Sequence, residues 1–124
     1  MHKIIDAPSA PAAVGPYCHA RLVGDTLYTS GQIGLIPDTG ELAQGVEAQA
    51  VQALDNLKAV LDAAGMGMED VVKTTVFLAD ISDFAAINAI YAKYFPGEPP
   101  ARSCVQAGAL PKGALFEIEA VAAK

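Results

Sequence analysis

Hydrophobic and polar positions alternate with several periods along the chain, and the longest regular stretch predicts a helix. Apolar residues recur at every third or fourth position over residues 46–64. This spacing is typical of an amphipathic helix of about five turns. Gly65 follows the last periodic position and is expected to end the helix in the left-handed conformation. Glu47, Gln49, Gln52, Asn56 and Lys58 are among the polar residues that lie elsewhere around this helix.

A second, shorter helix is predicted between a capping residue at Ser82 and the Pro96-Gly97 pair, which ends it. Its apolar stripe includes Phe84 and Tyr91, with the amide of Asn88 between them. A buried amide must find hydrogen-bond partners. Asn88 is therefore either a structural side chain or a ligand contact, and the pattern leaves both open.

Short segments with alternating or β-branched residues predict strands. A proline-rich stretch through Pro16 excludes helix after a possible edge strand at residues 3–5. The Gly24-Asp25 pair is a typical two-residue hairpin connection. The strands predicted after residue 16 are 17–23, 26–30, 71–79, 101–107 and 115–122.

This order of elements predicts an α+β fold, a mixed sheet with two helices packed on one face. The two-residue period places Arg102 with Cys104 on one face of their strand, and Glu117 with Glu119 on one face of the last strand. We expect the helices to cover the apolar face. The face bearing Arg102 and Glu117 should then meet water or another subunit.

Composition and charge narrow the class of protein. The 124 residues suit one domain, residues 1–124, and 24 of the apolar residues are alanines that permit close packing. A net charge of −6 without any Lys or Arg cluster disfavours nucleic acid as partner. The chain has neither a long apolar run nor the pattern of a signal peptide, so we expect a cytoplasmic protein with no membrane partner.

Metal and thiol chemistry have little support in the sequence. The possible ligands are scattered, whereas a metal site needs three or four that converge; they are His2, Cys18, His19 and Cys104. A nucleophilic pair of Cys104 with His19 would require the two to meet in space. A lone cysteine on a strand is more often a small hydrophobic residue.

Arg102 and Glu117 form the more informative combination. One interpretation is a structural ion pair at an interface. The other is that the planar guanidinium of Arg102 holds a substrate carboxylate while Glu117 orients a water molecule. Periodicity does not choose between them.

Six segments along the chain, taken together, point to a known family. They are Gly15-Pro16-Tyr17, residues 29–33 (TSGQI), 52–57 (QALDNL), 72–78 (VKTTVFL), 100–105 (PARSCV) and 116–120 (FEIEA). In this order, and spanning residues 8 to 122, the chain resembles the RidA/YjgF reactive-intermediate deaminases.

The resemblance implies a chorismate-mutase-like subunit that assembles into a homotrimer with ligand clefts between subunits. It implies hydrolysis of reactive enamines and imines (2-aminoacrylate, 2-iminopropanoate, 2-iminobutanoate) to 2-oxo acids and ammonia, without metal or organic cofactor. In family terms, Arg102 grips the substrate carboxylate and Glu117 positions the water. The other positions that match the cleft are Tyr17 and Ser30, which can hydrogen-bond the carbinolamine or the water, and Gly31, Asn88 and Cys104.

The chain also departs from the family pattern. Cys18-His19 replaces the usual Ser-Gln and is interpreted as a packing or surface change, and Phe116 replaces an aliphatic residue. The link from Phe95 to Pro100 is short and adjoins the expected cleft, so it bears on substrate size. An alternative function is a non-catalytic module that binds 2-oxo acids; an endoribonuclease or translation inhibitor is a minor alternative that the charge disfavours.

Overall fold

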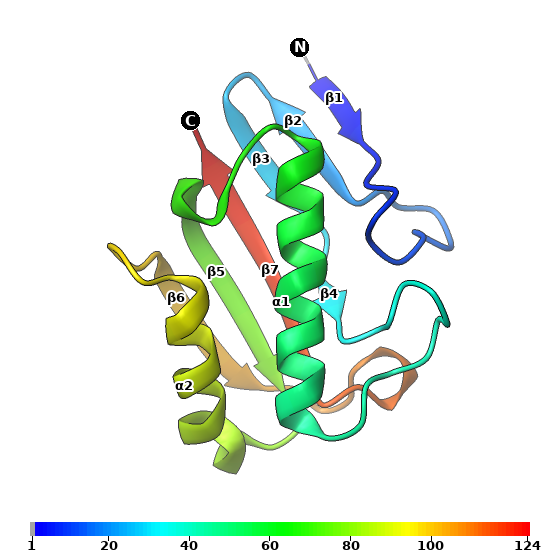
Figure 1. Cartoon of the computed structure of the whole chain (residues 1–124), viewed down its shortest axis with the longest axis vertical. Helices are drawn as coiled ribbons and strands as arrows, with labels where there is room; N and C mark the ends of the chain where they lie inside the picture. The colour runs from blue at the N-terminus through cyan, green and yellow to red at the C-terminus, as the bar shows by residue number, and fades with distance from the viewer. Residues whose placement is uncertain (1) are drawn as a thin grey trace.

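The computed structural model describes residues 2–124, which form two helices and a seven-stranded mixed sheet (Figure 1). The strands are β1 (His2–Ile5), β2 (Ala20–Val23), β3 (Thr26–Thr29), β4 (Gln32–Ile33), β5 (Val71–Leu78), β6 (Ala101–Gln106) and β7 (Phe116–Ala123). The helices are α1 (Val46–Ala63) and α2 (Phe84–Tyr94), and short 3₁₀ turns occupy Met68–Asp70, Ile81–Asp83 and Pro111–Gly113.

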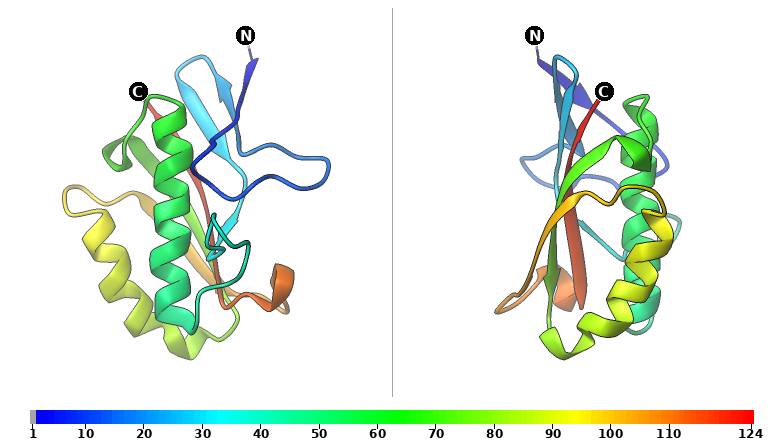
Figure 2. Two further views of the ribbon diagram at one scale, coloured as in Figure 1. Left: turned by 45° about the vertical axis from the view of Figure 1, so that its right-hand side comes forward. Right: turned by 90° about the vertical axis from the view of Figure 1, so that its left-hand side faces the viewer.

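The sheet has the order β1-β2-β3-β7-β5-β6, with β4 also paired to β7. Strands β5 and β6 are parallel, which requires the crossover that α2 supplies, and the other pairs are antiparallel. Both helices lie on one side of the sheet and the other side carries none (Figure 2). The predicted fold class is confirmed. Within residues 2–124, neither helix has the length and apolar character needed to cross a membrane.

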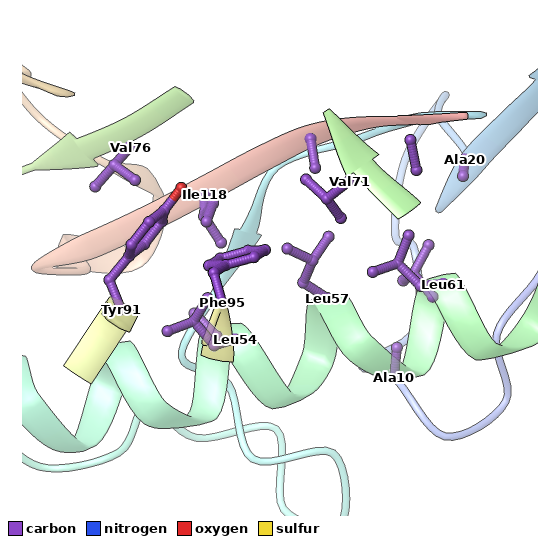
Figure 3. Close-up of a cluster of buried hydrophobic side chains, with 14 of the residues drawn as sticks. Ala10, Ala20, Leu54, Leu57, Leu61, Val71, Val76, Tyr91, Phe95 and Ile118 are labelled. Carbon is purple, nitrogen blue, oxygen red and sulfur yellow. The ribbon is translucent and has the colours of Figure 1, made fainter. Parts of the chain in front are cut away.

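The hydrophobic core lies between α1 and the sheet. Leu54, Leu57 and Leu61 follow the apolar stripe of α1 and are fully buried toward Val71 and Ile118 (Figure 3). Gly65 adopts φ 74° after the helix, as the pattern predicts. The amphipathic pattern of α1 therefore determined both its extent and the face that it buries.

Two polar residues of α1 are buried as well, because each binds the backbone of a neighbouring segment. Asn56 donates from Nδ2 to the carbonyls of Ile33 (3.1 Å) and Leu35 (2.9 Å). Gln49 accepts the backbone N–H of Leu115 at 2.8 Å through Oε1. The pattern placed both residues away from the apolar stripe, and only the tertiary structure shows that they bind neighbouring backbone.

Several element boundaries differ from the predictions. Strand β2 begins at Ala20, so Tyr17 lies in the preceding loop rather than in a strand. Ser82 does not cap the second helix: its N–H and hydroxyl bind Asp80 Oδ1 in a 3₁₀ turn, and α2 begins at Phe84. A local Asp–Ser hydrogen bond here competes with helix capping.

A break in the sheet at residues 30–31 is the main feature that the sequence analysis missed. β3 pairs with β7 up to Tyr28, and the chain then rejoins β7 as β4, at Gln32 and Ile33. Thr29 Oγ1 accepts the N–H of Ala120 at 3.0 Å within this interruption. Ser30 and Gly31 are thereby released from regular pairing beside the centre of β7.

Candidate functional site

Arg102 lies on the helix-covered side of the sheet, against α2. Its Nη1 donates to Asn88 Oδ1 at 2.8 Å. Its guanidinium carbon lies 4.8 Å from the ring centroid of Tyr91 and 5.4 Å from that of Phe84. The expectation that Arg102 shares the uncovered face with Glu117 is wrong, because β6 directs residue 102 to the same side as its buried neighbour Thr74 on β5. Two rings and one amide fix the guanidinium in place.

The groups around Arg102 are themselves held. The hydroxyls of Tyr91 and Thr74 are hydrogen-bonded at 2.7 Å in the core. Burial raises the pKa of Tyr91, while the Thr74 hydrogen bond and the charge of Arg102 oppose the rise. Asn88, which the sequence left open as structural or ligand-binding, orients the arginine.

A hollow of about 510 Å³ adjoins Arg102. Its walls come from α2 and from the short link between α2 and β6, which contributes Pro99 and Pro100. The prediction that this link adjoins the expected cleft is consistent with that placement. The full lining consists of Asn88, Tyr91, Ala92, Phe95, Pro99, Pro100 and Arg102.

Cys104 follows Arg102 on the same side of β6 and packs against the core. Burial raises the pKa of its thiol, and the nearby charge of Arg102 opposes the rise. A thiol with a raised pKa stays protonated near neutral pH and is a weak nucleophile. This environment argues against Cys104 as a nucleophile, and Cys104 is not part of the lining of the hollow beside Arg102.

Glu117 lies on the opposite, uncovered side of the sheet. Its neighbours Phe116 and Ile118 are fully buried toward the helices, so the strand's alternation turns Glu117 outward. Gly31 lies directly against it: a Cβ at residue 31 would overlap the carboxylate and lie 2.9 Å from Cδ. Burial, and secondarily the charge of Glu119, raise the pKa of Glu117.

Ser30 and Tyr17 lie on the segments next to Gly31. Ser30 donates from Oγ to the carbonyl of Cys18 at 2.6 Å, and its N–H donates to the carbonyl of His19 at 2.9 Å. Tyr17 immediately precedes these residues and its side chain is 52% exposed. The hydroxyl oxygen of Ser30 keeps its acceptor capacity for a ligand.

His19 anchors the loop that carries Tyr17, a role that the sequence analysis did not assign beyond packing. Its side chain is only 3% exposed. Nδ1 accepts the N–H of Ala7 at 2.9 Å, and Nε2 donates to the carbonyl of Pro11 at 2.7 Å. Both ring nitrogens are thereby engaged, which argues against a catalytic pair with Cys104.

The predicted site residues thus form two groups, one around Arg102 and one around Glu117, and these two residues lie on opposite sides of the sheet. We name them the arginine half-site (Arg102, Asn88, Cys104 and the hollow) and the glutamate half-site (Glu117, Gly31, Ser30 and the adjoining Tyr17). Within residues 2–124 no carboxylate forms an ion pair with Arg102, so a structural ion pair of Arg102 with Glu117 would require two subunits. Residues 2–124 also contain no group of three or more His, Cys, Asp or Glu placed to hold a metal ion.

Comparison with known proteins identifies relatives over nearly the whole chain. The family model described as Endoribonuclease L-PSP matches residues 7–124. A Rattus norvegicus protein named 2-iminobutanoate/2-iminopropanoate deaminase is 53% identical over 123 residues, covering 98% of this chain and 90% of that protein. Two Escherichia coli crystal structures, the YjgF gene product (48% identical) and TdcF with bound serine (45%), each superpose with a TM-score of 0.95 and 98% coverage of both chains. The chain therefore belongs to the RidA/YjgF family.

Proposed function

We propose that this protein is a cofactor-independent hydrolytic deaminase. Its substrates are the reactive enamines and imines 2-aminoacrylate, 2-iminopropanoate and 2-iminobutanoate, and its products are 2-oxo acids and ammonia. The names of its relatives support this reaction. The net charge of −6 favours a small-molecule substrate over a nucleic acid.

The observation that carries the proposal is the state of Arg102. Its guanidinium is oriented by Asn88 at 2.8 Å and by two aromatic rings, beside a hollow, and no carboxylate of residues 2–124 neutralises it. A preoriented guanidinium fork binds a carboxylate through two parallel hydrogen bonds. Every proposed substrate carries such a carboxylate.

The glutamate half-site supplies the water. A protonated imine is already electrophilic, so the protein only has to orient the water molecule and stabilise the charge that develops in the transition state. The oxygen of water bonds to the carbon of the protonated imine while Glu117 takes a proton from that water, which gives a neutral carbinolamine. Glu117 then returns the proton to the amine nitrogen. The C–N bond breaks as the C=O bond of the 2-oxo acid forms, and the hydroxyl proton leaves with ammonia as ammonium. A raised pKa suits Glu117 to take up and return this proton. Gly31 lets the ligand approach the backbone, and Ser30 and Tyr17 can hydrogen-bond the carbinolamine.

Two copies of the chain must meet to complete the site. Arg102 belongs to the edge strand β6 and lies on the helix-covered side of the sheet, whereas Glu117 lies on the uncovered side. Contact between two different surfaces of the same chain is head-to-tail, and it forms a closed ring when the rotation from copy to copy returns to the first one. The uncovered face exposes Val105 (47%) and Tyr28 (51%), apolar groups that a second copy would bury. We propose the homotrimer of the family as this ring.

The test couples a pyridoxal-phosphate dehydratase to the protein and follows imine decay. Wild type should accelerate decay over buffer. Arg102→Ala should lower kcat/KM about 100-fold, because a charge-assisted bidentate contact is worth roughly 3 kcal/mol. The matched control is Arg21→Ala, an exposed arginine outside both half-sites, which should keep full activity. Binding of 2-oxo acids without any acceleration would instead favour the non-catalytic module.

Mixing two inactive variants tests the shared site. Arg102→Ala and Glu117→Gln subunits are unfolded together, refolded and assayed. Random assembly places an intact arginine opposite an intact glutamate in about a quarter of the clefts, so about a quarter of the wild-type activity should return. If both half-sites acted within one chain, no activity would return.

A further inference from the structure

We propose that His19 is a positioning residue for the glutamate half-site, and that it works only while its ring is neutral. On protonation, Nδ1 exchanges the N–H of Ala7 for the carboxylate of Asp6, and the loop that leads to Tyr17 loses its anchor. For its effect on activity this inference rests on the proposed function. It predicts a deaminase whose activity falls more steeply in acid than the titration of Glu117 alone would require.

The hydrogen bonds of the ring fix which form of histidine the fold requires. Nε2 of His19 lies 2.7 Å from the carbonyl of Pro11, which can only accept, so Nε2 carries a hydrogen. Nδ1 lies 2.9 Å from the N–H of Ala7, which can only donate, so Nδ1 is unprotonated. The neutral tautomer with hydrogen on Nε2 satisfies both backbone groups. A protonated ring would set two donors against each other at Nδ1.

Asp6 offers the alternative partner for a protonated ring. Its Oδ1 lies 3.5 Å from Nδ1 of His19, and the side chain of Asp6 is 92% exposed whereas that of His19 is 3% exposed. A buried charge requires a partner of opposite sign. Because the single hydrogen on Nδ1 then points to the carboxylate, the buried N–H of Ala7 is left without its acceptor.

The other titratable groups around the ring have different partners. Cys18 donates its thiol to a backbone carbonyl at 3.5 Å. Arg21 on β2 contacts His2 on β1, with 3.2 Å between Nη2 and Nδ1. Within residues 2–124, Asp6 is the only carboxylate in ion-pair distance of His19. The titratable groups of neighbouring elements that form no hydrogen bond or ion pair with the ring are Lys3 on β1, Tyr17 on the loop, Asp25 and Tyr28 on the β2–β3 hairpin, Glu117 on β7, and Lys58 and Asp62 on α1, which pair with each other.

The loss at Ala7 reaches the glutamate half-site through the backbone. Ala7 is buried, and its carbonyl accepts the N–H of Ala10 at 3.1 Å. Ala10 is buried in turn beside α1 (Figure 3). At the other end of the loop, the carbonyl of His19 accepts the N–H of Ser30 at 2.9 Å, and Tyr17 lies two residues before His19. Releasing the ring from Ala7 therefore loosens the segment that carries Tyr17 and binds Ser30.

His19→Gln tests the effect on activity, with His2→Gln as the matched control. The chain has two histidines, and His2 is exposed on β1, outside both half-sites. A glutamine amide donates and accepts without titrating. We measure kcat/KM for the imine derived from alanine from pH 8 to pH 5.5. Glu117 and the imine titrate alike in every variant, so each profile is divided by that of His19→Gln. The ratios for wild type and for His2→Gln should fall by about threefold or more over this range, and a constant ratio would overturn the proposal.

Asp6→Asn tests the exchange of partners while the histidine stays in place. Without the carboxylate, the protonated ring has no partner of opposite charge, so the loss of activity should begin at lower pH than in wild type. An acid limb that stays at the wild-type pH or moves to higher pH would overturn the proposal.

Nuclear magnetic resonance separates this inference from the proposed function. On the assembled protein, long-range proton–nitrogen spectra should show the His19 ring with hydrogen on Nε2 alone at pH 8. As the ring becomes protonated, the hydrogen-exchange protection factor of the Ala7 amide should fall by about tenfold or more, while that of buried Val76 stays constant. A ring that stays neutral down to pH 5, or an Ala7 amide that stays protected beside a protonated ring, would overturn the inference. Loss of protection at Ala7 in a protein that hydrolyses no imine would refute the deaminase and leave the exchange of partners standing.

Discussion

Gly31→Ala is the sharpest test of the geometry around Glu117, because a single methyl group would occupy the position of a carboxylate. The Cβ at residue 31 would overlap the carboxylate of Glu117 and lie 2.9 Å from its Cδ and 3.2 Å from its Cγ. Gly31 is not among the glycines with positive φ, so its backbone accepts alanine without strain. The only group that has to move is the end of the Glu117 side chain.

The expected cost to folding is small. Displacing Glu117 from its rotamer costs about 0.5–1.5 kcal/mol, and replacing a glycine stabilises by about 0.4–1 kcal/mol through the unfolded chain. The free energy of unfolding should therefore change by less than about 1 kcal/mol. Activity should respond far more, because moving a group that positions the water by about 1 Å can lower kcat/KM about 100-fold.

Gly34→Ala is the matched control, since it introduces the same methyl group against a rigid neighbour. Its Cβ would lie 2.6 Å from both Cα and the carbonyl oxygen of Gln49, which belong to the backbone of α1. Overpacking of this kind costs about 1–3 kcal/mol. Urea unfolding and the coupled imine assay, run on both variants, separate the two effects. Wild-type activity in Gly31→Ala would refute the role of Glu117, and a stability loss as large as that of Gly34→Ala would refute the displacement of a side chain.

Three further predictions concern stability and are measured by urea unfolding. His19→Ala leaves the buried N–H of Ala7 and the partly buried carbonyl of Pro11 without their side-chain partner and should cost about 2–4 kcal/mol. His19→Gln, whose amide donates and accepts, should cost less than half as much; equal losses would argue against the hydrogen bonds as the cause. Asn56→Ala removes the hydrogen bonds from Nδ2 to the carbonyls of Ile33 and Leu35, of which the first still accepts the N–H of Leu35. It should cost about 1–3 kcal/mol, against less than about 1 kcal/mol for exposed Lys58→Ala; a reversed order would contradict the burial argument. The pKa of Glu117 is raised above 4.5 in the folded state, so ionisation of Glu117 lowers the free energy of unfolding as pH rises through the folded pKa. Glu117→Gln should therefore be more stable than wild type at pH 8 and lose that advantage below pH 4.5. An advantage that grows toward low pH would refute this sign.

The sequence by itself determined the elements whose formation depends on local pattern. The three-to-four spacing over residues 46–64 can bury an apolar stripe only as a helix, and β-branched residues at 71–79 favour a strand. Six segments of the sequence, those around Arg102 and Glu117 among them, together also indicated the family, because their residue types and order are specific. Both half-sites were therefore nominated before any contact between residues was known.

The tertiary structure decided which face each residue occupies and what it contacts. Periodicity assigns faces within one strand, but it does not say which face of β6 aligns with which face of β7; the pairing of both strands through β5 placed Arg102 and Glu117 on opposite sides. The break at Ser30 and Gly31 likewise depends on pairing with β7, which lies almost ninety residues further along the chain. The local sequence pattern does not specify how strands far apart in the chain pair with each other. Because this pairing decides which face each residue occupies, it also decides that the site is divided between two faces of the sheet.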